Sequence, residues 1–367
     1  MLLKNLTLIN FKNFDQLELE LSPKINCFVG NNGVGKTNLL DALYYLSFCK
    51  SRFNAVDSQN IKHGQDFFVI QGEYLRKDEP EHIHCGLKKG QRKKFQRNKT
   101  DYNRLSEHIG FLPLVMKSPA DINFIYDGSE ERRKFIDGVI SQFNHSYLSD
   151  LLHYNRTLSQ RNKLLKGDQA NPQQFTDTIE IYDNQLVLFG ERIFKNRKHF
   201  TSELLPLFQD YYQRISQGNE EVHLEYQSQL FEASFDSLLG SSLDKDRILQ
   251  YTTKGIHKDD IVLSIGNKSL KKFGSQGQQK TYLVALKFAQ HDYIKTKTGL
   301  NPILLLDDIF DKLDRNRVKQ IISLVTENHF GQIFISDTNK RRIFDLLRDS
   351  KIDYSIFEVE DGKLKIE

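Results

Sequence analysis

The sequence lacks several features that would assign it to a common class of protein. Its 367 residues include no tryptophan and only three cysteines, Cys27, Cys49 and Cys85. The cysteines lie far apart without a C-x-x-C spacing, which argues against a disulfide framework or a zinc site and favours reduced thiols. No apolar run approaches the roughly 18 residues of a membrane span, and the polar start MLLKNLTLINF lacks the layout of a signal peptide. We therefore expect a cytoplasmic protein without a membrane partner.

The sequence also has little net charge. A formal charge of +4 is too small to require a polyanionic partner, and no helix-turn-helix or zinc-finger pattern predicts sequence-specific DNA binding. The chain does have a hydrophobic share of 38%, with 15 Tyr and 26 Phe in the absence of tryptophan. These numbers are typical of a soluble protein with a substantial core and, at this length, of about two domains.

A phosphate-binding loop lies near the start of the chain. The segment INCFVGNNGVGKTNLLDALYYLSF is typical of a short buried strand, a glycine-rich loop and an amphipathic helix. The loop fits G-x-x-x-x-G-K-[ST], in which glycines let successive backbone N–H groups face phosphates at a helix N-terminus. We expect Lys36 to reach the β- and γ-phosphates of ATP, and the Thr37 hydroxyl to bind Mg²⁺. The residues expected to bind the nucleotide are Gly30, Asn31, Asn32, Gly33, Val34, Gly35, Lys36 and Thr37.

A second nucleotide motif is discounted. Asn98-Lys99-Thr100-Asp101 matches N-K-x-D, with which GTPases recognise guanine, but that motif should end a buried apolar strand. Here it ends the strongly basic segment KKGQRKKFQRNK, and no D-x-x-G lies between it and the phosphate-binding loop. We therefore predict a polar hairpin or loop in this segment.

The other half of the nucleotide site is predicted in the run NPILLLDD. An apolar segment that ends in two carboxylates is typical of a buried parallel strand, and ligands bind at the carboxyl ends of such strands. We expect Asp307 to hold Mg²⁺, directly or through water, and Asp308 to orient and polarise the attacking water. A further strand, QIFIS, follows without the histidine found after it in transporter ATPases. Asp337 or Thr338 is then the candidate sensor of the γ-phosphate.

The stretch FGSQGQQK, Phe273 to Lys280, lies at the entrance of an amphipathic helix. Its first turn offers free N–H groups, a hydroxyl and a positive dipole end, and Gly277 allows close backbone approach. Ser-x-Gly helix starts are common, but the phosphate-binding loop already accounts for this chain's nucleotide. We therefore interpret the stretch as a receptor for the γ-phosphate held by a second copy of the protein. It resembles the signature helix of ABC-type ATPases, with Ser275, Gly277 and Gln278 at the motif positions.

The spacing of these motifs predicts an insertion. Lys36 and Ser275 lie much further apart than a transporter ATPase requires, and residues 120–250 are rich in helical periodicity. Pro206 interrupts the longest periodic run, so we expect that helix to kink or restart there. The heptads are too few for a long coiled coil, and a compact helical lobe is expected instead. Together with Lys36 and Asp308, the three signature residues complete the predicted catalytic set.

Over essentially its whole length the chain resembles the RecF family of bacterial recombination-repair ATPases, which belong to the SMC-like, ABC-type class. The resemblance is carried by LTLINFKNF, SPADINFIYDGSEERRKFID, YNRTLSQRNKLLK, TTKGIHKDDI, GSQGQQKTYLVALKFAQ and LLLDDIFDKLD, in that order. It implies a weak ATPase that dimerises on ATP and binds DNA at gaps, both single- and double-stranded and without sequence specificity. It also implies cooperation with RecO and RecR in loading recombinase. Ile256 and Lys258 stand where the family pattern has proline and arginine. The rigid turn that the proline would form and the bidentate contact that the arginine would make are therefore in doubt for this chain.

The predicted fold is α/β, an ABC-type P-loop ATPase head with an inserted, mainly helical second lobe. We place the head in residues 1–115 and 250–367 and the lobe in residues 116–249. An SMC-like head from another DNA-processing or defence system shares all the nucleotide motifs and stays open as an alternative. A transporter ATPase subunit would have a shorter spacing and the missing histidine, and a small-molecule kinase would lack the signature helix.

Basic segments are the candidate DNA contacts. Residues 88–99 contain seven Lys and Arg residues and no acidic residue, and smaller clusters occur at 132–134, at 268–272 and at 340–342. Scattered cations of this kind can bind phosphates without reading bases. Each cluster is more often a solvated surface than a DNA contact, so the sequence alone leaves the DNA-binding face open.

Overall fold

The computed structural model describes residues 1–167, 171–218, 220–311, 313–327, 329–348, 352–360 and 362–366. The chain divides into two compact units. Unit 1 comprises Met1–Ile122, Asp210–Asn219 and Ser275–Glu367, and unit 2 comprises Asn123–Gln209 and Glu220–Gly274. None of the helices in the described ranges combines the length and the apolar character needed to cross a bilayer.

The boundaries of these units differ from the predicted head and lobe. Residues 116–122 and 210–219 belong to the first unit, and residues 250–274 belong to the second. The last difference follows from strand pairing, because β10 (Asp260–Ile265) pairs antiparallel with β9 (Val222–Gln227) of the lobe. Short strands of this kind carry no sign in the sequence of which partner they will pair with.

Unit 1 contains two six-stranded sheets. The first has the order β2-β1-β4-β5-β6-β7, is antiparallel throughout and consists of β1 (Leu2–Phe11), β2 (Phe14–Glu20), β4 (Phe67–Arg76), β5 (Glu79–Lys88), β6 (Lys94–Arg97) and β7 (Thr100–Asp101). The second has the order β15-β14-β3-β13-β12-β8 and is parallel except for the β14–β15 pair. Its strands are β3 (Ile25–Val29), β8 (Leu114–Lys117), β12 (Ile303–Asp307), β13 (Ile333–Asp337), β14 (Tyr354–Glu360) and β15 (Lys363–Ile366).

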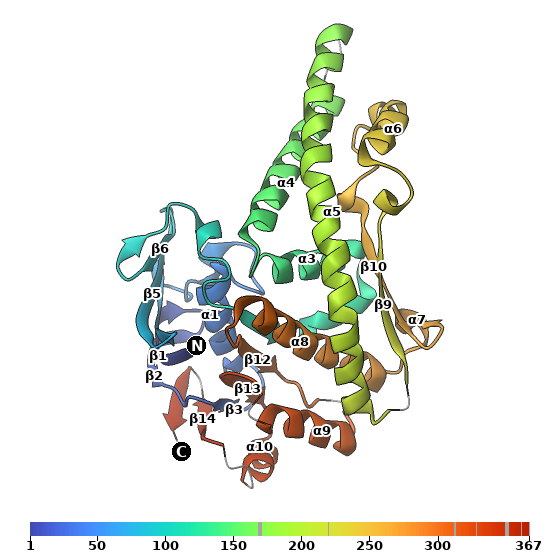
Figure 1. Ribbon diagram of the computed structural model, residues 1–367. Helices are drawn as coiled ribbons and strands as arrows, with labels where there is room; N and C mark the ends of the chain where they lie inside the picture. Colours follow the sequence, from blue (N-terminus) through green and yellow to red (C-terminus); the bar gives the residue numbers. More distant parts are fainter. Residues whose placement is uncertain are drawn as a thin grey trace. The chain divides into compact units, whose positions relative to one another are not determined.

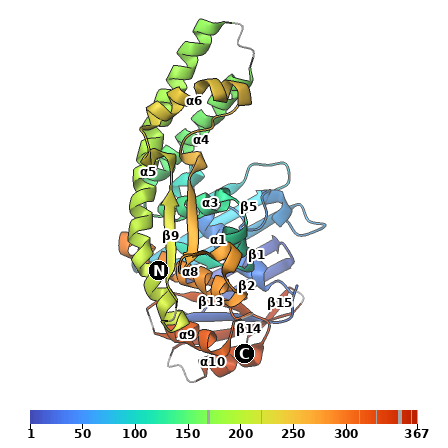
Figure 2. The ribbon, with the colours of Figure 1, turned by 90° about the vertical axis from the view of Figure 1, so that its right-hand side faces the viewer.

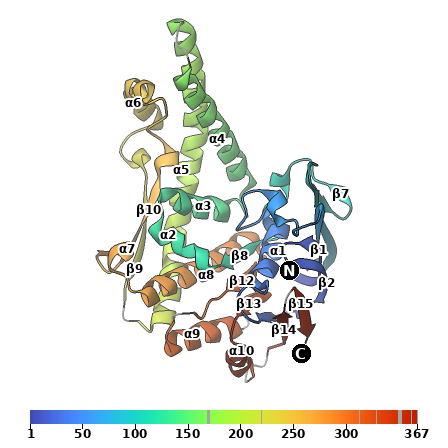
Figure 3. The same ribbon diagram turned by 180° about the vertical axis from the view of Figure 1, so that it is seen from behind.

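Helix α1 (Lys36–Phe48) lies between the two sheets, as Figure 3 shows for β1 and β12 on its two sides. Its buried leucines share one hydrophobic core with apolar residues of both sheets. The central strands β3, β12 and β13 are buried at every position, which explains their mainly apolar sequence. Because they are parallel, their carboxyl ends meet at one edge of the sheet. The other long helices of unit 1 are α8 (Gln276–Thr298), α9 (Arg315–Thr326) and α10 (Lys340–Leu347) (Figure 1).

The predicted polar hairpin at N-K-x-D is confirmed. Strands β6 and β7 pair antiparallel, with Arg97 opposite Thr100. Asn98 and Lys99 form the two-residue turn between them, both in the left-handed region with φ of 49° and 68°. Such turns match the twist of hairpin strands, and this segment is therefore no guanine-binding loop.

Unit 2 is mainly helical but also contains a three-stranded sheet that the sequence analysis did not predict. Its helices are α2 (Asn123–Tyr126), α3 (Ser129–Ile140), α4 (His145–Lys166), α5 (Pro172–Ser216, whose last turns belong to unit 1), α6 (Phe235–Leu249) and α7 (Leu270–Phe273). The sheet has the order β11-β10-β9, with β11 at Lys268–Ser269. Helices α4 and α5 run side by side, and β9 follows α5 (Figures 1 and 2).

Helix α5 continues through Pro206, so of the predicted kink or restart the restart is wrong, and the kink stays a prediction. Its apolar face stays in register on both sides of the proline, where Phe200, Leu204 and Phe208 are fully buried. Packing of this face outweighs the roughly 3 kcal/mol by which an interior proline destabilises a helix.

The segments RRKFID and TTKGIHKDDI bind each other inside unit 2. Arg132 of α3 contacts Asp260 at 2.6 Å, and the fully buried Arg197 of α5 contacts Asp259 at 2.8 Å and Asp137 of α3 at 2.9 Å. A buried charge is costly unless it is paired in this way. These residues therefore join α3, α5 and the start of β10.

Candidate nucleotide-binding site

The phosphate-binding loop runs from β3 to α1 and curls around the Lys36 ammonium. Lys36 Nζ donates hydrogen bonds to the carbonyl oxygens of Gly30 at 2.8 Å and Asn31 at 2.7 Å. The side chain is buried, and burial lowers the pKa of Lys36 while the carboxylates of Asp308 and Asp307 oppose that shift. The carbonyls of the loop thus hold the ammonium where phosphate oxygens can replace them as acceptors.

Two glycines of the loop sit where no side chain would fit. At Gly35, φ is +114° and an added Cβ would lie 2.4 Å from Asn13 Nδ2; at Gly30, φ is +151° and a Cβ would lie 2.5 Å from the Val359 carbonyl oxygen. Asn13 follows β1 and braces the loop, because its amide donates to the Val34 carbonyl at 2.9 Å. The motif therefore needs glycine here for close backbone packing as well as for phosphate access.

The ends of β12 and β13 complete the site. The Thr37 hydroxyl lies 3.1 and 3.0 Å from the two oxygens of Asp307, although 270 positions separate them in the chain. The Ser336 hydroxyl donates to Asp307 Oδ1 at 2.5 Å. Burial raises the pKa of Asp307, and the hydrogen bonds from Ser336 and Thr37 oppose that shift. A hydroxyl and a carboxylate in contact are hard oxygen ligands of the type Mg²⁺ prefers, so these residues fit the predicted metal site.

Asp308 occupies an unusual backbone conformation directly after β12. Its φ is +46°, which is uncommon for a residue other than glycine and costs about 1 kcal/mol or more. Its N–H donates to the Ser336 hydroxyl at 3.1 Å, so one serine holds both acidic residues. The half-buried carboxyl has its pKa raised mainly by burial, and Lys36 supplies the strongest opposing charge. A raised pKa favours proton acceptance from water.

The predicted signature forms the start of α8. Ser275 is the N-cap, its hydroxyl accepts the N–H of Gln278 at 3.2 Å, and the Gln278 side chain accepts the Ser275 N–H at 2.8 Å. A Cβ at Gly277 would lie 3.1 Å from Arg317 Nη1, tighter than most contacts of its kind. Ser275 is exposed, and its hydroxyl hydrogen remains able to donate to an anion that approaches from outside.

The two candidate sensors after β13 differ in environment. The Asp337 carboxylate is buried, contacts Arg342 at 2.7 Å and accepts the Asn339 N–H at 2.6 Å. Thr338 is exposed. Asp337 is therefore already paired with a cation of its own chain, whereas Thr338 faces solvent.

Ser336 and Asn13 are site residues that the sequence analysis missed. Ser336 ends the apolar run QIFIS, and Asn13 follows LTLINF, so each is a polar residue at the end of a strand. That position is a weak signal, because most strands end in polar residues. Their partners, Asp307 and Val34, lie far away in the chain.

The basic segment 88–99 is only partly available to a ligand. Lys93, one of the seven cations of this segment, points inward and contacts Asp57 at 2.7 Å and the Cys49 carbonyl at 2.6 Å. Arg97 pairs with Glu81 at 2.5 Å. The five exposed cations of the segment are Lys88, Lys89, Arg92, Lys94 and Lys99.

The cluster at 132–134 is also internally paired. Arg132 contacts Asp260, Arg133 donates to the Asp259 carbonyl at 2.6 Å, and Lys134 contacts Glu131 at 2.8 Å. Arg132 and Arg133 thus stabilise unit 2 and are less suited to bind phosphates of DNA than the exposed lysines of unit 1, whereas Lys134 is itself exposed.

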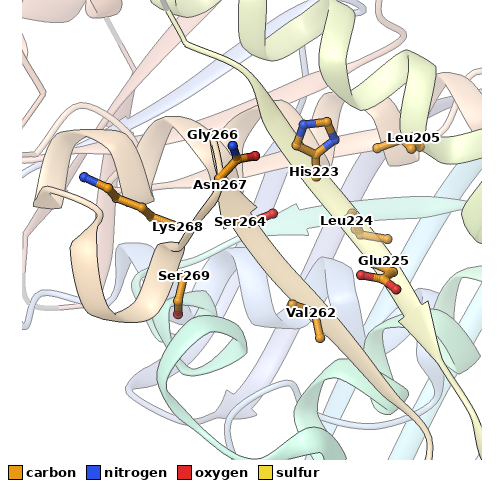
Figure 4. Close-up of a pocket in the computed structure, with 10 residues that line it drawn as sticks. All are labelled: Leu205, His223, Leu224, Glu225, Val262, Ser264, Gly266, Asn267, Lys268 and Ser269. Carbon is orange, nitrogen blue, oxygen red and sulfur yellow. The ribbon is translucent and has the colours of Figure 1, made fainter.

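A cavity of about 570 Å³ lies in unit 2, and none of the predicted site residues lines it (Figure 4). It is formed by the β9–β10–β11 sheet, whose His223, Glu225 and Val262 line it, together with Leu205 of α5. The lining is mixed and open, and it brings no cluster of charges together.

Comparison with known proteins identifies the relatives of this chain. It matches the family described as RecF/RecN/SMC N terminal domain over residues 2–363. It is 51% identical over 367 residues to the DNA replication and repair protein RecF of Phocaeicola vulgatus, a match that covers 99% of this chain and 98% of the relative. The RecF of Flavobacterium johnsoniae is 49% identical over 357 residues, which is 97% of this chain and 99% of that protein.

Solved structures agree on the fold. The recombination mediator protein RecF with ATP, of the RecFOR pathway, has a TM-score of 0.87 at 30% identity, covering 100% of this chain and 97% of that one. An Smc head domain from Pyrococcus furiosus has a TM-score of 0.60 at 17% identity, covering 100% and 96%, which shows a shared fold alone. The predicted α/β ABC-type ATPase head with an inserted helical lobe is thus confirmed.

Proposed function

The chain belongs to the RecF family of DNA replication and repair proteins, and we propose that it is an ATP-gated DNA-binding switch of recombinational repair. In this proposal, binding of ATP with Mg²⁺ brings two copies of the chain together, and weak hydrolysis lets them separate. The dimer binds single- and double-stranded DNA at gaps without reading the base sequence. It cooperates there with RecO and RecR in loading recombinase.

The contact between Thr37 and Asp307 carries the proposal. It joins the phosphate-binding loop to the acidic strand end, at the N-terminus of α1, where a phosphate-bound divalent cation would be held. When bound, Mg²⁺·ATP supplies the reactive phosphoryl group. Lys36 leaves the carbonyls of its loop to bind phosphate oxygens, and Asp308 orients the attacking water and accepts its proton.

The signature residues act on the nucleotide of the other copy. Ser275 is exposed at the N-terminus of α8, a position suited to receive a γ-phosphate. Each copy would then contribute its loop to one site and its α8 start to the other. ATP would thereby act as the bridge between the two copies.

Two variants in mixture test this arrangement. Ser275→Arg should bind ATP as a monomer but fail to dimerise, because its guanidinium blocks the helix start while the loop is unchanged. Mixed with Lys36→Met, it should regain part of the ATPase activity, since heterodimers contain one site with an intact loop and an intact signature. Light scattering with and without ATP measures dimerisation, and normal dimerisation of Ser275→Arg would exclude a signature that acts across two subunits.

DNA binding is proposed for exposed cations of the first sheet. Lys88, Lys94 and Lys99 lie on β5, on β6 and in the β6–β7 turn, without acidic residues among residues 88–99. Phosphate contacts from such side chains supply affinity that depends on salt and not on base sequence.

A further inference from the structure

Lys117 is a buried lysine that the site described above does not use. It is the last residue of β8, the strand next to β12, and it pairs in parallel register with Leu306, directly before Asp307. Its side chain is only 3% exposed. Lysine is almost never buried to this extent unless its charge is paired.

Within the described part of the chain, the Lys117 ammonium makes no hydrogen bond and no ion pair. Asp121 follows Lys117 on the same loop and is the carboxylate that acts most strongly on its charge, but Asp121 already contacts other residues. Arg52 contacts Asp121 at 3.1 Å, Lys287 contacts it at 3.5 Å, and its second oxygen accepts the Ser118 N–H at 2.7 Å. Three cations therefore share one carboxylate, and Lys117 is the cation without a direct contact.

The hydroxyl of the next residue is buried without a hydrogen bond to any residue that the structure describes. The Ser118 hydroxyl is buried, with 1% of the residue exposed, and it has no hydrogen-bond partner among the described residues. An ammonium on a nearly buried side chain without a counter-charge and a buried hydroxyl without a hydrogen bond each destabilise a folded protein. Two of them at adjacent positions indicate a place built for an anion.

The location identifies the anion. The strand order β3-β13-β12-β8 puts the phosphate-binding loop after β3 and Lys117 after β8, on opposite sides of the acidic pair after β12. The charge of Lys117 reaches both acids, since it lowers the pKa of Asp307 and of Asp308. A triphosphate held by the loop extends its terminal phosphate toward those acids and hence toward Lys117.

We propose that Lys117 is a second phosphate-binding cation, which contacts the terminal phosphate of a bound nucleoside triphosphate from the side opposite Lys36. The inference rests on the proposed ATP binding and makes it more specific. An ammonium that is unpaired in the free protein gains its counter-charge only when the terminal phosphate is present. Lys117 therefore makes the site prefer triphosphate over diphosphate.

The test compares Lys117→Met with Lys287→Met, a matched loss of a buried lysine that is already paired. Calorimetry with Mg²⁺ measures the affinity of each full-length variant for a non-hydrolysable ATP analogue and for ADP. Lys117→Met should bind the analogue at least tenfold more weakly, which is about 1.4 kcal/mol, and ADP within twofold of wild type. Lys287→Met should keep the wild-type ratio of the two affinities.

Thermal unfolding without nucleotide supplies the second readout. Removal of an unpaired buried charge should leave the melting temperature of Lys117→Met equal to that of wild type or higher, whereas Lys287→Met should melt lower because it breaks an ion pair. Lys117→Arg keeps the charge and should retain more of the triphosphate preference than Lys117→Met. Equal loss of ATP-analogue and ADP affinity in Lys117→Met, or no loss of either, would overturn the inference. Wild-type protein that binds neither nucleotide would instead refute the proposed function.

Discussion

Ser336 donates a hydrogen bond of 2.5 Å to the carboxylate of Asp307. The same hydroxyl accepts the N–H of Asp308, so it sets the positions of both acids at the end of β12. It is fully buried, so water cannot replace it without a rearrangement of the strand ends. We regard Ser336 as a positioning residue for the metal site.

Ser336→Ala should therefore weaken the site without removing any residue that touches the nucleotide. Loss of a buried charge-assisted hydrogen bond is worth about 1.5 to 3 kcal/mol, so Mg²⁺-dependent nucleotide binding should weaken about tenfold or more. Ser336→Thr retains the hydroxyl and is the matched control. Magnesium titrations of nucleotide binding measure the effect, and an Ala variant that matches wild type would contradict the positioning role.

The two acids of β12 should respond differently to amide substitution. Asp308→Asn should leave Mg²⁺·ATP binding largely intact but reduce hydrolysis at least a hundredfold, because a general base contributes about 10²- to 10⁴-fold. The ATP-bound dimer should then accumulate. Asp307→Asn should instead weaken the binding of the metal. If both variants behave alike in magnesium titrations, the proposed division of roles is wrong.

Lys93 and Lys94 are neighbours in the chain and should have different roles. Charge reversal at Lys94 together with Lys99 should lower DNA affinity for all sequences alike and reduce the salt dependence by about two counterions. Lys93→Met should instead reduce the free energy of unfolding by about 2 kcal/mol, because it leaves the Asp57 carboxylate without its cation. Salt titrations of DNA binding and denaturant unfolding separate the two effects. If the salt dependence of DNA binding is unchanged in the double charge reversal, this hairpin is a solvated surface and does not contact DNA.

His108 should make the protein less stable in acid. The ring is fully buried, with Nε2 donating to the Leu46 carbonyl at 2.7 Å and Nδ1 beside the Tyr102 hydroxyl at 2.9 Å. Burial lowers the pKa of His108 from 6.5 to about 4. Between these values the unfolded chain binds a proton that the folded chain does not, so the free energy of unfolding falls as pH falls from 6.5 to 4.

The expected loss from this histidine is up to about 3 kcal/mol. Urea unfolding at intervals between pH 7 and pH 4 measures it. In His108→Gln the amide can still donate to Leu46. The free energy of unfolding of this variant should depend less steeply on pH between 6.5 and 4, because the proton that His108 takes up on unfolding is absent. His63→Gln, at an exposed position, is the matched control. A His108→Gln profile parallel to that of wild type would show that other groups dominate the acid response.

The motifs that could be predicted from the sequence are those whose geometry is local. The loop from Gly30 to Thr37, the acidic pair after β12 and the helix start at Ser275 each contain their own turn, strand end or N-cap within a few residues. Glycine positions, apolar runs and hydroxyl caps encode such features directly. The order and spacing of the motifs also sufficed to predict the ATPase head and its inserted lobe.

The tertiary structure decided which side chains meet across long separations. Whether Lys93 faces solvent or Asp57, whether residues 250–274 join the head or the lobe, and which partner Ser336 holds all depend on packing between distant segments. The continuation of α5 through Pro206 has the same origin, because burial of its apolar face overrides a local helix breaker. The unpaired charge of Lys117 is the clearest case, because its role depends on β8 lying beside β12. These two strands are far apart in the chain, and the residues around them do not indicate that they pair.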